Sequence, residues 1–145
     1  MGEIAYHYQT EFSLKGEAKH TDWIIRVVEK FDLKAGILNF IFVSDEELLE
    51  MNRTYLGHDY FTDIITFEYE EIEGISGDLF VSTDRVLENA NDLKCDFEVE
   101  IRRVMAHGVL HLLGYKDKSK EDEMKMRNLE EEALELFHVK HNPNV

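Results

Sequence analysis

Apolar residues recur with two different periods along the chain, which predicts a mixture of strands and helices. Four short runs either alternate between apolar and polar positions or are rich in β-branched and aromatic residues, as strands are. These runs cover residues 4–8, 37–43, 64–69 and 77–82. An acidic segment containing Gly74 separates the last two runs, so we expect those two strands to be adjacent and antiparallel.

Helical spacing accounts for most of the remaining chain. In the first helical segment, apolar residues from Ile24 to Phe31 fall at the spacing of one buried helix face. The later segments cover about 45–55, 83–93, 97–113 and 120–138. Ser44, three residues before Glu47, forms a capping box for the second helix.

Together these elements predict one α+β domain over residues 1–145. We expect a mixed sheet of about four strands, about five helices and a frayed tail at about 139–145. The single cysteine, Cys95, excludes an intrachain disulfide and a cysteine-rich zinc site.

The composition is that of a folded but strongly acidic protein. Hydrophobic residues make up 43% of the chain, yet no apolar run approaches the roughly 18 residues that cross a membrane. Because the first residues also lack the features of a secretory signal, we expect a cytoplasmic protein without a membrane partner. The formal charge is −15. Binding of RNA would therefore require a local basic patch, or a partner that delivers the RNA.

Two histidines stand four residues apart in the fourth predicted helix. This spacing places His107 and His111 on one helix face, where both imidazoles can bind the same metal ion. Gly114 is typical of a helix end and lets the chain turn back, which puts Asp117 within reach as a third ligand. Three protein ligands leave a position for water, as in catalytic sites. The spacing alone is more typical of two histidines that form hydrogen bonds in a core. Gly114, the carboxylate within reach and the apolar helix make the metal site an equally weighted interpretation.

The residue after His107 is Gly108, where zinc proteases with H-E-x-x-H carry a glutamate as general base. A metallopeptidase is therefore a minor alternative. Glycine at this position also lets either a substrate or a packed strand approach the helix closely.

Three motifs, in this order along the chain, resemble those of the YbeY family of bacterial rRNA maturation factors and metal-dependent endoribonucleases. The motifs are NRTY at 52–55 with Asp59 and TDIITF at 62–67, GDLFVS at 77–82, and HGVLHLLGY at 107–115. The resemblance spans about residues 37–135. It implies an α+β fold with a mixed sheet, a zinc-type metal and cleavage of single-stranded RNA. It also implies roles in 16S rRNA 3′-end maturation and ribosome quality control. The implied partners are rRNA in the small ribosomal subunit, a small-subunit ribosomal protein and an Era-like GTPase.

The third metal ligand departs from the family pattern, which usually has histidine in G-Y-D-H. An alignment without gaps places Asp117 in that position. Aspartate can bind zinc, but a set of two histidines and one carboxylate also suits Fe²⁺ or Mn²⁺. An alignment with one inserted residue would place Lys118 there, and a charged lysine cannot bind a metal. We favour the alignment that makes Asp117 the ligand.

A second departure concerns a basic residue. The resemblance implies an arginine in contact with phosphate directly after the tyrosine of the first motif, but that residue is Leu56. Arg53, one helical turn earlier, is our candidate for this catalytic role, and a solvated helix arginine is the equally weighted alternative. Lys116, Lys118 and Arg102 are candidates for a positive, substrate-binding rim, unless they belong to an ordinary charged surface.

The sequence therefore favours a metal-dependent endoribonuclease with His107, His111 and Arg53 as catalytic residues. Asp117 would complete the metal site, and no residue stands out as general base. Asp63 matches the family pattern, with either a structural or a catalytic role. A non-catalytic ribosome-assembly factor with a structural metal is the main alternative.

Overall fold

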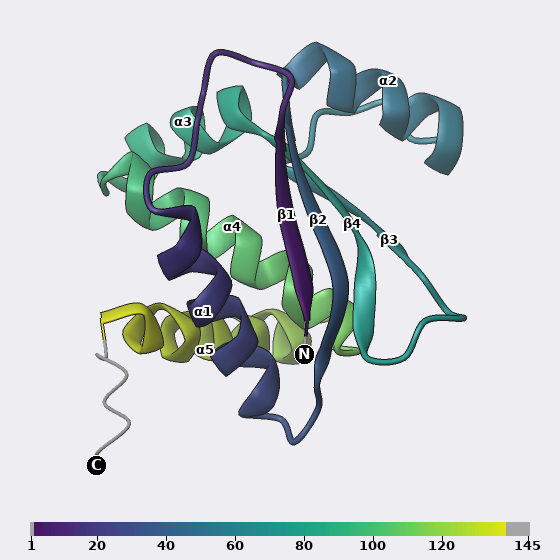
Figure 1. The fold of residues 1–145 in the computed structure, drawn as a ribbon. Coiled ribbons are helices and arrows are strands. Elements are labelled where there is room, and N and C mark those ends of the chain that lie inside the picture. Colours follow the sequence, from purple (N-terminus) through teal and green to yellow (C-terminus); the bar gives the residue numbers. More distant parts are fainter. Residues whose placement is uncertain (1, 139–145) are drawn as a thin grey trace.

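A four-stranded mixed sheet forms the central layer of the molecule (Figure 1). The computed structural model describes residues 2–138, and its strands are β1 (Glu3–Tyr8), β2 (Ala35–Val43), β3 (Ile64–Glu68) and β4 (Ile75–Ser82). Their order across the sheet is β1-β2-β4-β3. The pairs β1–β2 and β2–β4 are parallel, whereas β3 and β4 are antiparallel, as the sequence predicted.

Helices cover both faces of this sheet, but unequally. The helices are α1 (Glu17–Glu29), α2 (Asp45–Leu56), α3 (Thr83–Leu93), α4 (Phe97–Leu112) and α5 (Lys120–His138). Four of them lie on one face, and α2 alone lies on the other (Figure 1). The predicted α+β architecture is thus confirmed. The predicted capping box is present too, because the Glu47 amide donates to Ser44 Oγ at 3.2 Å.

Alternation along β2 divides the apolar side chains between two cores. Leu38, Phe40 and Phe42 belong to the larger core, which includes side chains of α1, α4 and α5. Ile41 and Val43 belong to a smaller core with Leu48 of α2. The larger core holds α4 against the sheet, and α4 carries the two histidines.

The first helix is shorter than the apolar spacing predicted. Helix α1 ends at Glu29, so Phe31 does not belong to its buried face. The Phe31 ring instead lies 5.5 Å from the ring of Tyr115, in the turn after α4. The expected fraying of residues 139–145 lies outside the described residues.

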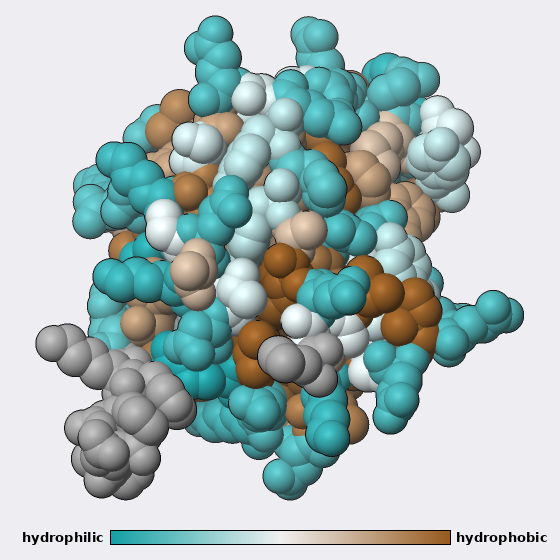
Figure 2. Space-filling view, viewed as in Figure 1, coloured by the Kyte–Doolittle hydropathy of each residue, from teal (hydrophilic) through white to brown (hydrophobic). Residues whose placement is uncertain are grey.

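Polar residues dominate one face of the molecule. Figure 2 shows that the face seen in Figure 1 is largely hydrophilic, with smaller hydrophobic areas between the polar side chains. Within residues 2–138, no helix combines the length and the apolar composition needed to cross a membrane.

Candidate metal centre

Helix α4 is the most deeply packed helix next to the sheet, and this fixes its histidines in place. Ten of its 16 residues are buried. A Cβ atom at Gly108 would lie 2.5 Å from Ile64 Cδ1 and 2.7 Å from Leu79 Cδ2. The missing side chain therefore lets α4 lie close to β3 and β4. Of the two roles considered for Gly108, the structure supports the packed strand.

The end of α4 turns the chain back toward the histidines. Gly114 has a φ angle of 103°, which a residue with a side chain rarely adopts. Its amide donates to the carbonyl of His111, and the Tyr115 amide donates to that of Leu110, both at 3.0 Å. This pair of bonds is a Schellman motif. The turn brings Asp117 beside the helix face that it has just left.

His107, His111 and Asp117 form one cluster of potential metal ligands. Asp117 Oδ2 lies 3.4 Å from His107 Nε2 and 3.9 Å from His111 Nε2. One ligand atom of each residue lies within 4.8 Å of the others. Two ligands at about 2.1 Å from one ion in a tetrahedral site are about 3.4 Å apart. The spacing and the donor set thus fit a divalent metal, and the predicted Asp117, not Lys118, completes the cluster.

Both imidazoles are oriented through the nitrogen that faces away from Asp117. His107 Nδ1 lies 2.7 Å from Glu130 Oε2, and His111 Nδ1 lies 2.9 Å from the carbonyl oxygen of Tyr115. Acceptors at Nδ1 favour the tautomer with its proton there, which leaves the Nε2 lone pair free for a metal. This arrangement is typical of metal-binding histidines and not of histidines that merely fill a core.

Glu130 is a site residue that the sequence analysis missed. It is buried on α5 between Met126 and Ala133, in the stripe of that helix that faces the rest of the protein. An acidic residue within a buried helix stripe is uncommon unless it is paired. That pattern was the available signal, but it does not say which residue is the partner.

The charges around His107 favour its protonated form when no metal is present. Burial alone would lower the pKa of His107, but the hydrogen bond and charge of Glu130, with the charges of Asp63 and Asp117, raise it overall. Burial also raises the pKa of Asp63, against the opposing effect of His107. Asn89 Nδ2 donates to Asp63 Oδ2 at 3.2 Å. Asp63 thus belongs to the electrostatic surroundings of the site and is not part of the ligand cluster.

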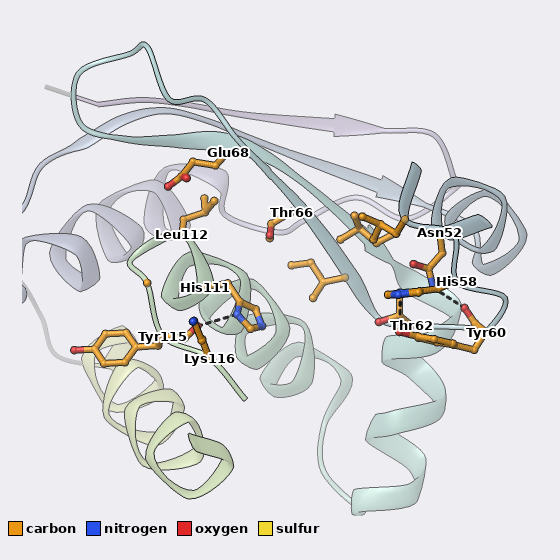
Figure 3. A pocket seen from close by; sticks show the side chains of 14 residues that line it. Asn52, His58, Tyr60, Thr62, Thr66, Glu68, His111, Leu112, Tyr115 and Lys116 are labelled. Carbon is orange, nitrogen blue, oxygen red and sulfur yellow. Dashed lines mark hydrogen bonds between the residues drawn. The ribbon is translucent and has the colours of Figure 1, made fainter. Parts of the chain in front are cut away.

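A cavity of about 520 Å³ opens beside His111 (Figure 3). It is lined by β3, by the turn after α4 with Lys116, and by the loop between α2 and β3. Two further cavities, of about 400 Å³ and 510 Å³, are lined in part by His107 and Glu130. The cluster therefore lies among hollows that a substrate can enter.

The predicted positive rim is only partly present. Lys116 lines the cavity beside His111, and Lys118 is exposed on the same turn. Arg53 is not among the residues that line this cavity, and its Nε atom lies 2.5 Å from Asp59 Oδ1. Arg102 does not join the site. It precedes His107 by five residues, which is about 140° around the helix, and its guanidinium carbon lies 4.1 Å from the centre of the Phe137 ring.

Arg127 of α5 is the second residue that the sequence analysis missed. It is exposed and lines both cavities that His107 and Glu130 share. Within residues 2–138, no carboxylate forms an ion pair with it. No motif marked this arginine, because its position beside the cluster depends on how α5 packs against α4.

Comparison with known proteins assigns the family. The family described as Endoribonuclease YbeY matches residues 5–138. The chain belongs to the YbeY family. A relative from Flavobacterium psychrophilum, named Endoribonuclease YbeY, is 47% identical over 96% of this chain and 99% of its own length. A relative of the same name from Flavobacterium johnsoniae is 48% identical, over 94% and 98%.

A solved structure has a similar fold. The solution structure of a Thermotoga maritima protein is similar with a TM-score of 0.63 and 27% sequence identity. The similarity covers 94% of this chain and 89% of that protein. The resemblance noted from the three motifs is thus confirmed over nearly the whole domain.

Proposed function

We propose that this protein is a metal-dependent endoribonuclease that cleaves single-stranded RNA. The observation that carries the proposal is the orientation of the two imidazoles. Their Nε2 atoms face Asp117, while Glu130 and the Tyr115 carbonyl hold their Nδ1 atoms. Membership in the YbeY family and the name of the curated relatives support ribonuclease chemistry at this site.

The cluster suits zinc, which we propose as the metal, and it is also compatible with Fe²⁺ or Mn²⁺. Held by His107, His111 and Asp117, the ion would supply Lewis-acid stabilisation of a phosphate oxygen or a more acidic water. Metal analysis of the purified protein, with Asp117→Ala for comparison, tests this assignment. Unchanged metal content in that variant would exclude Asp117 as a ligand.

The protein itself supplies orientation and positive charge. Glu130 keeps the His107 ring in one orientation and its Nε2 lone pair toward the ligand cluster. Lys116 on one side of the cluster and Arg127 on the other are placed to hold the phosphates of a bound RNA. The guanidinium of Arg53 is paired with Asp59, so it is not available for a phosphate. Arg53 would contribute to RNA binding only by holding the loop that contains Asp59.

We also propose that the substrate is the 3′ end of 16S rRNA in the small ribosomal subunit. A small-subunit ribosomal protein and an Era-like GTPase are the proposed protein partners. The acidic surface supports such partners, since a chain with a net charge of −15 attracts free RNA poorly but attracts a basic protein. Unprocessed 16S 3′ ends in cells that carry only His111→Ala would support this substrate.

Cleavage of a defined single-stranded RNA by highly purified protein tests the activity. We expect the metal-loaded wild type to cleave and His111→Ala to be inactive. His7→Ala replaces an exposed histidine of β1 and serves as a control for contaminating nucleases and for the loss of an imidazole. Equal cleavage by all three proteins would refute the proposal. Intact RNA with retained metal would favour the assembly factor, and cleavage of peptides alone would favour the peptidase.

A further inference from the structure

The loop between α2 and β3 places aromatic rings at the surface. Tyr55, at the end of α2, and Tyr60 and Phe61, in the loop, are each about half exposed or more, with exposed fractions of 66%, 56% and 49%. Exposed rings that lie together commonly mark a contact surface, since leaving them in water forgoes the free energy of burial. Their orientation decides what each ring can contact.

Only one of these three rings faces the metal centre. Tyr55 lies edge-on to Phe67 at 5.9 Å and lines a separate hollow beside α2. Phe61 lies beneath the guanidinium group of Arg85, at 5.0 Å. Tyr60, together with His58, lines the cavity that His111 also lines (Figure 3). A flat molecule in that cavity can thus lie between the metal cluster and the His58–Tyr60 pair.

The His58 and Tyr60 rings form a stacked pair. Their centroids are 5.1 Å apart and their planes differ by 19°. The Tyr60 hydroxyl lies 2.9 Å from His58 Nδ1, so the two polar groups satisfy each other. The pair therefore offers flat ring surfaces to a ligand without requiring the ligand to satisfy these polar atoms.

Helix α2 holds this pair in position. The buried Asn52 accepts a hydrogen bond from the His58 amide at 3.1 Å through its carbonyl, and its side chain donates to the Tyr60 carbonyl at 2.9 Å. Arg53 Nε donates to Oδ1 of Asp59, the residue between His58 and Tyr60, at 2.5 Å. A ring surface that is ordered before binding loses less entropy when a ligand stacks on it.

We infer that the His58–Tyr60 pair is a subsite for an unpaired nucleobase of the RNA substrate, an inference that rests on the proposed function. Proteins that recognise single-stranded RNA stack splayed bases on aromatic rings. The cavity of about 520 Å³ falls in the range that holds a small organic ligand. His111 lines this cavity and also belongs to the metal cluster. A base stacked on the pair would therefore belong to the same RNA strand as the phosphate at the metal.

The charge of the cavity favours stacking over phosphate attraction. Its lining contains one lysine, Lys116, and one carboxylate, Glu68, so these charges nearly cancel. Stacking on an aromatic ring contributes to binding without any positive charge, which suits a protein as acidic as this one. We therefore expect RNA affinity to depend weakly on salt, with a logarithmic slope on the order of −1.

Binding of short 2′-O-methyl oligoadenylate to the full-length, metal-loaded protein tests the subsite. Fluorescence anisotropy gives the affinity, and the length of the recovered oligonucleotide shows that it was not cleaved. We expect Tyr60→Ala to weaken binding about fivefold to 150-fold, and Tyr60→Phe to keep most of the affinity. Phe61→Ala is the matched control, because it removes a neighbouring exposed ring that faces Arg85.

An abasic oligomer with the same number of phosphates separates stacking from charge. We expect it to bind more weakly than oligoadenylate to the wild type, and equally to the wild type and Tyr60→Ala. Unchanged binding of oligoadenylate by Tyr60→Ala, an equal loss in Phe61→Ala, or no binding by the wild type would overturn the subsite. If binding depends on Tyr60 but metal-loaded protein leaves unmodified RNA intact, the subsite stands and the proposed nuclease function fails.

Discussion

Removing the carboxylate of Glu130 is predicted to weaken metal binding although Glu130 is not a ligand. Its Oε2 atom accepts a charge-assisted hydrogen bond of 2.7 Å from His107 Nδ1. The carboxylate is buried and is itself held by Arg103, whose Nη1 lies 3.8 Å from Glu130 Oε1. Without this carboxylate, the His107 ring is no longer held in one orientation. It also lacks the nearby negative charge that makes Nε2 a stronger ligand for a metal ion.

The expected magnitude follows from the role of such partners in metal sites. Losing a hydrogen-bond partner of a metal-binding histidine typically weakens metal affinity 10- to 100-fold, or about 1.4–2.7 kcal/mol. Glu130→Gln keeps the size and an acceptor oxygen but removes the charge, so we expect a loss near tenfold. Glu130→Ala also removes the acceptor, and its loss should approach 100-fold.

Competition with a chelating zinc indicator measures this affinity directly. Glu131→Gln is the matched control: Glu131 is the next residue, its carboxylate lies 2.5 Å from Arg103, and it makes no contact with His107. Thermal unfolding of the metal-free variants shows whether the fold is kept. Wild-type zinc affinity in both Glu130 variants, with the fold intact, would refute the role assigned to this carboxylate.

Three other predictions follow from single residues. Gly108→Ala should lower the free energy of unfolding by about 0–2 kcal/mol in urea titrations, because crowding against β3 and β4 outweighs better helix propensity; a clear gain in stability would count against this packing. Burial lowers the pKa of His20, so its contribution to stability should fall as the pH drops below its ordinary pKa of 6.5. The wild type should thus lose stability relative to His20→Gln, by at most about 1.4 kcal/mol per pH unit, and a constant difference would contradict this. Arg127→Ala should lower kcat/KM for RNA by about tenfold or more, whereas a large loss in Arg53→Ala alone would restore Arg53 as the phosphate contact.

The parts of the site that the sequence predicted are those set by local geometry. One helical turn separates His107 from His111, so their common face follows from the helix itself. Gly114 has the left-handed conformation that its position after a helix suggested, and this turn places Asp117. All three residues lie within one short segment, where the path of the chain depends little on the rest of the fold.

The residues that the sequence missed depend on contacts between distant segments. Glu130 meets His107 across the packing of α5 on α4, which are 23 residues apart at this contact. The cavity beside His111 joins the turn after α4 to a loop more than 50 residues earlier. The spacing of residues within one helix or strand carries no information on contacts between distant segments. The sequence therefore shows where acidic and aromatic residues stand but not which residues they contact.

The same limit applies to the basic residues predicted to contact RNA. An arginine serves a phosphate only if no carboxylate of the protein already holds it, and pairing is decided by the fold. Arg53 is held by Asp59, and Arg103 by glutamates that include Glu130, while Arg102 is packed beneath an aromatic ring. Arg103 thus holds Glu130, which orients His107, and its guanidinium is not available to bind the substrate. In a chain with 31 acidic residues and 16 basic ones, most arginines have a carboxylate close by, so Arg127, Lys116 and the aromatic His58–Tyr60 pair are the groups proposed to engage RNA.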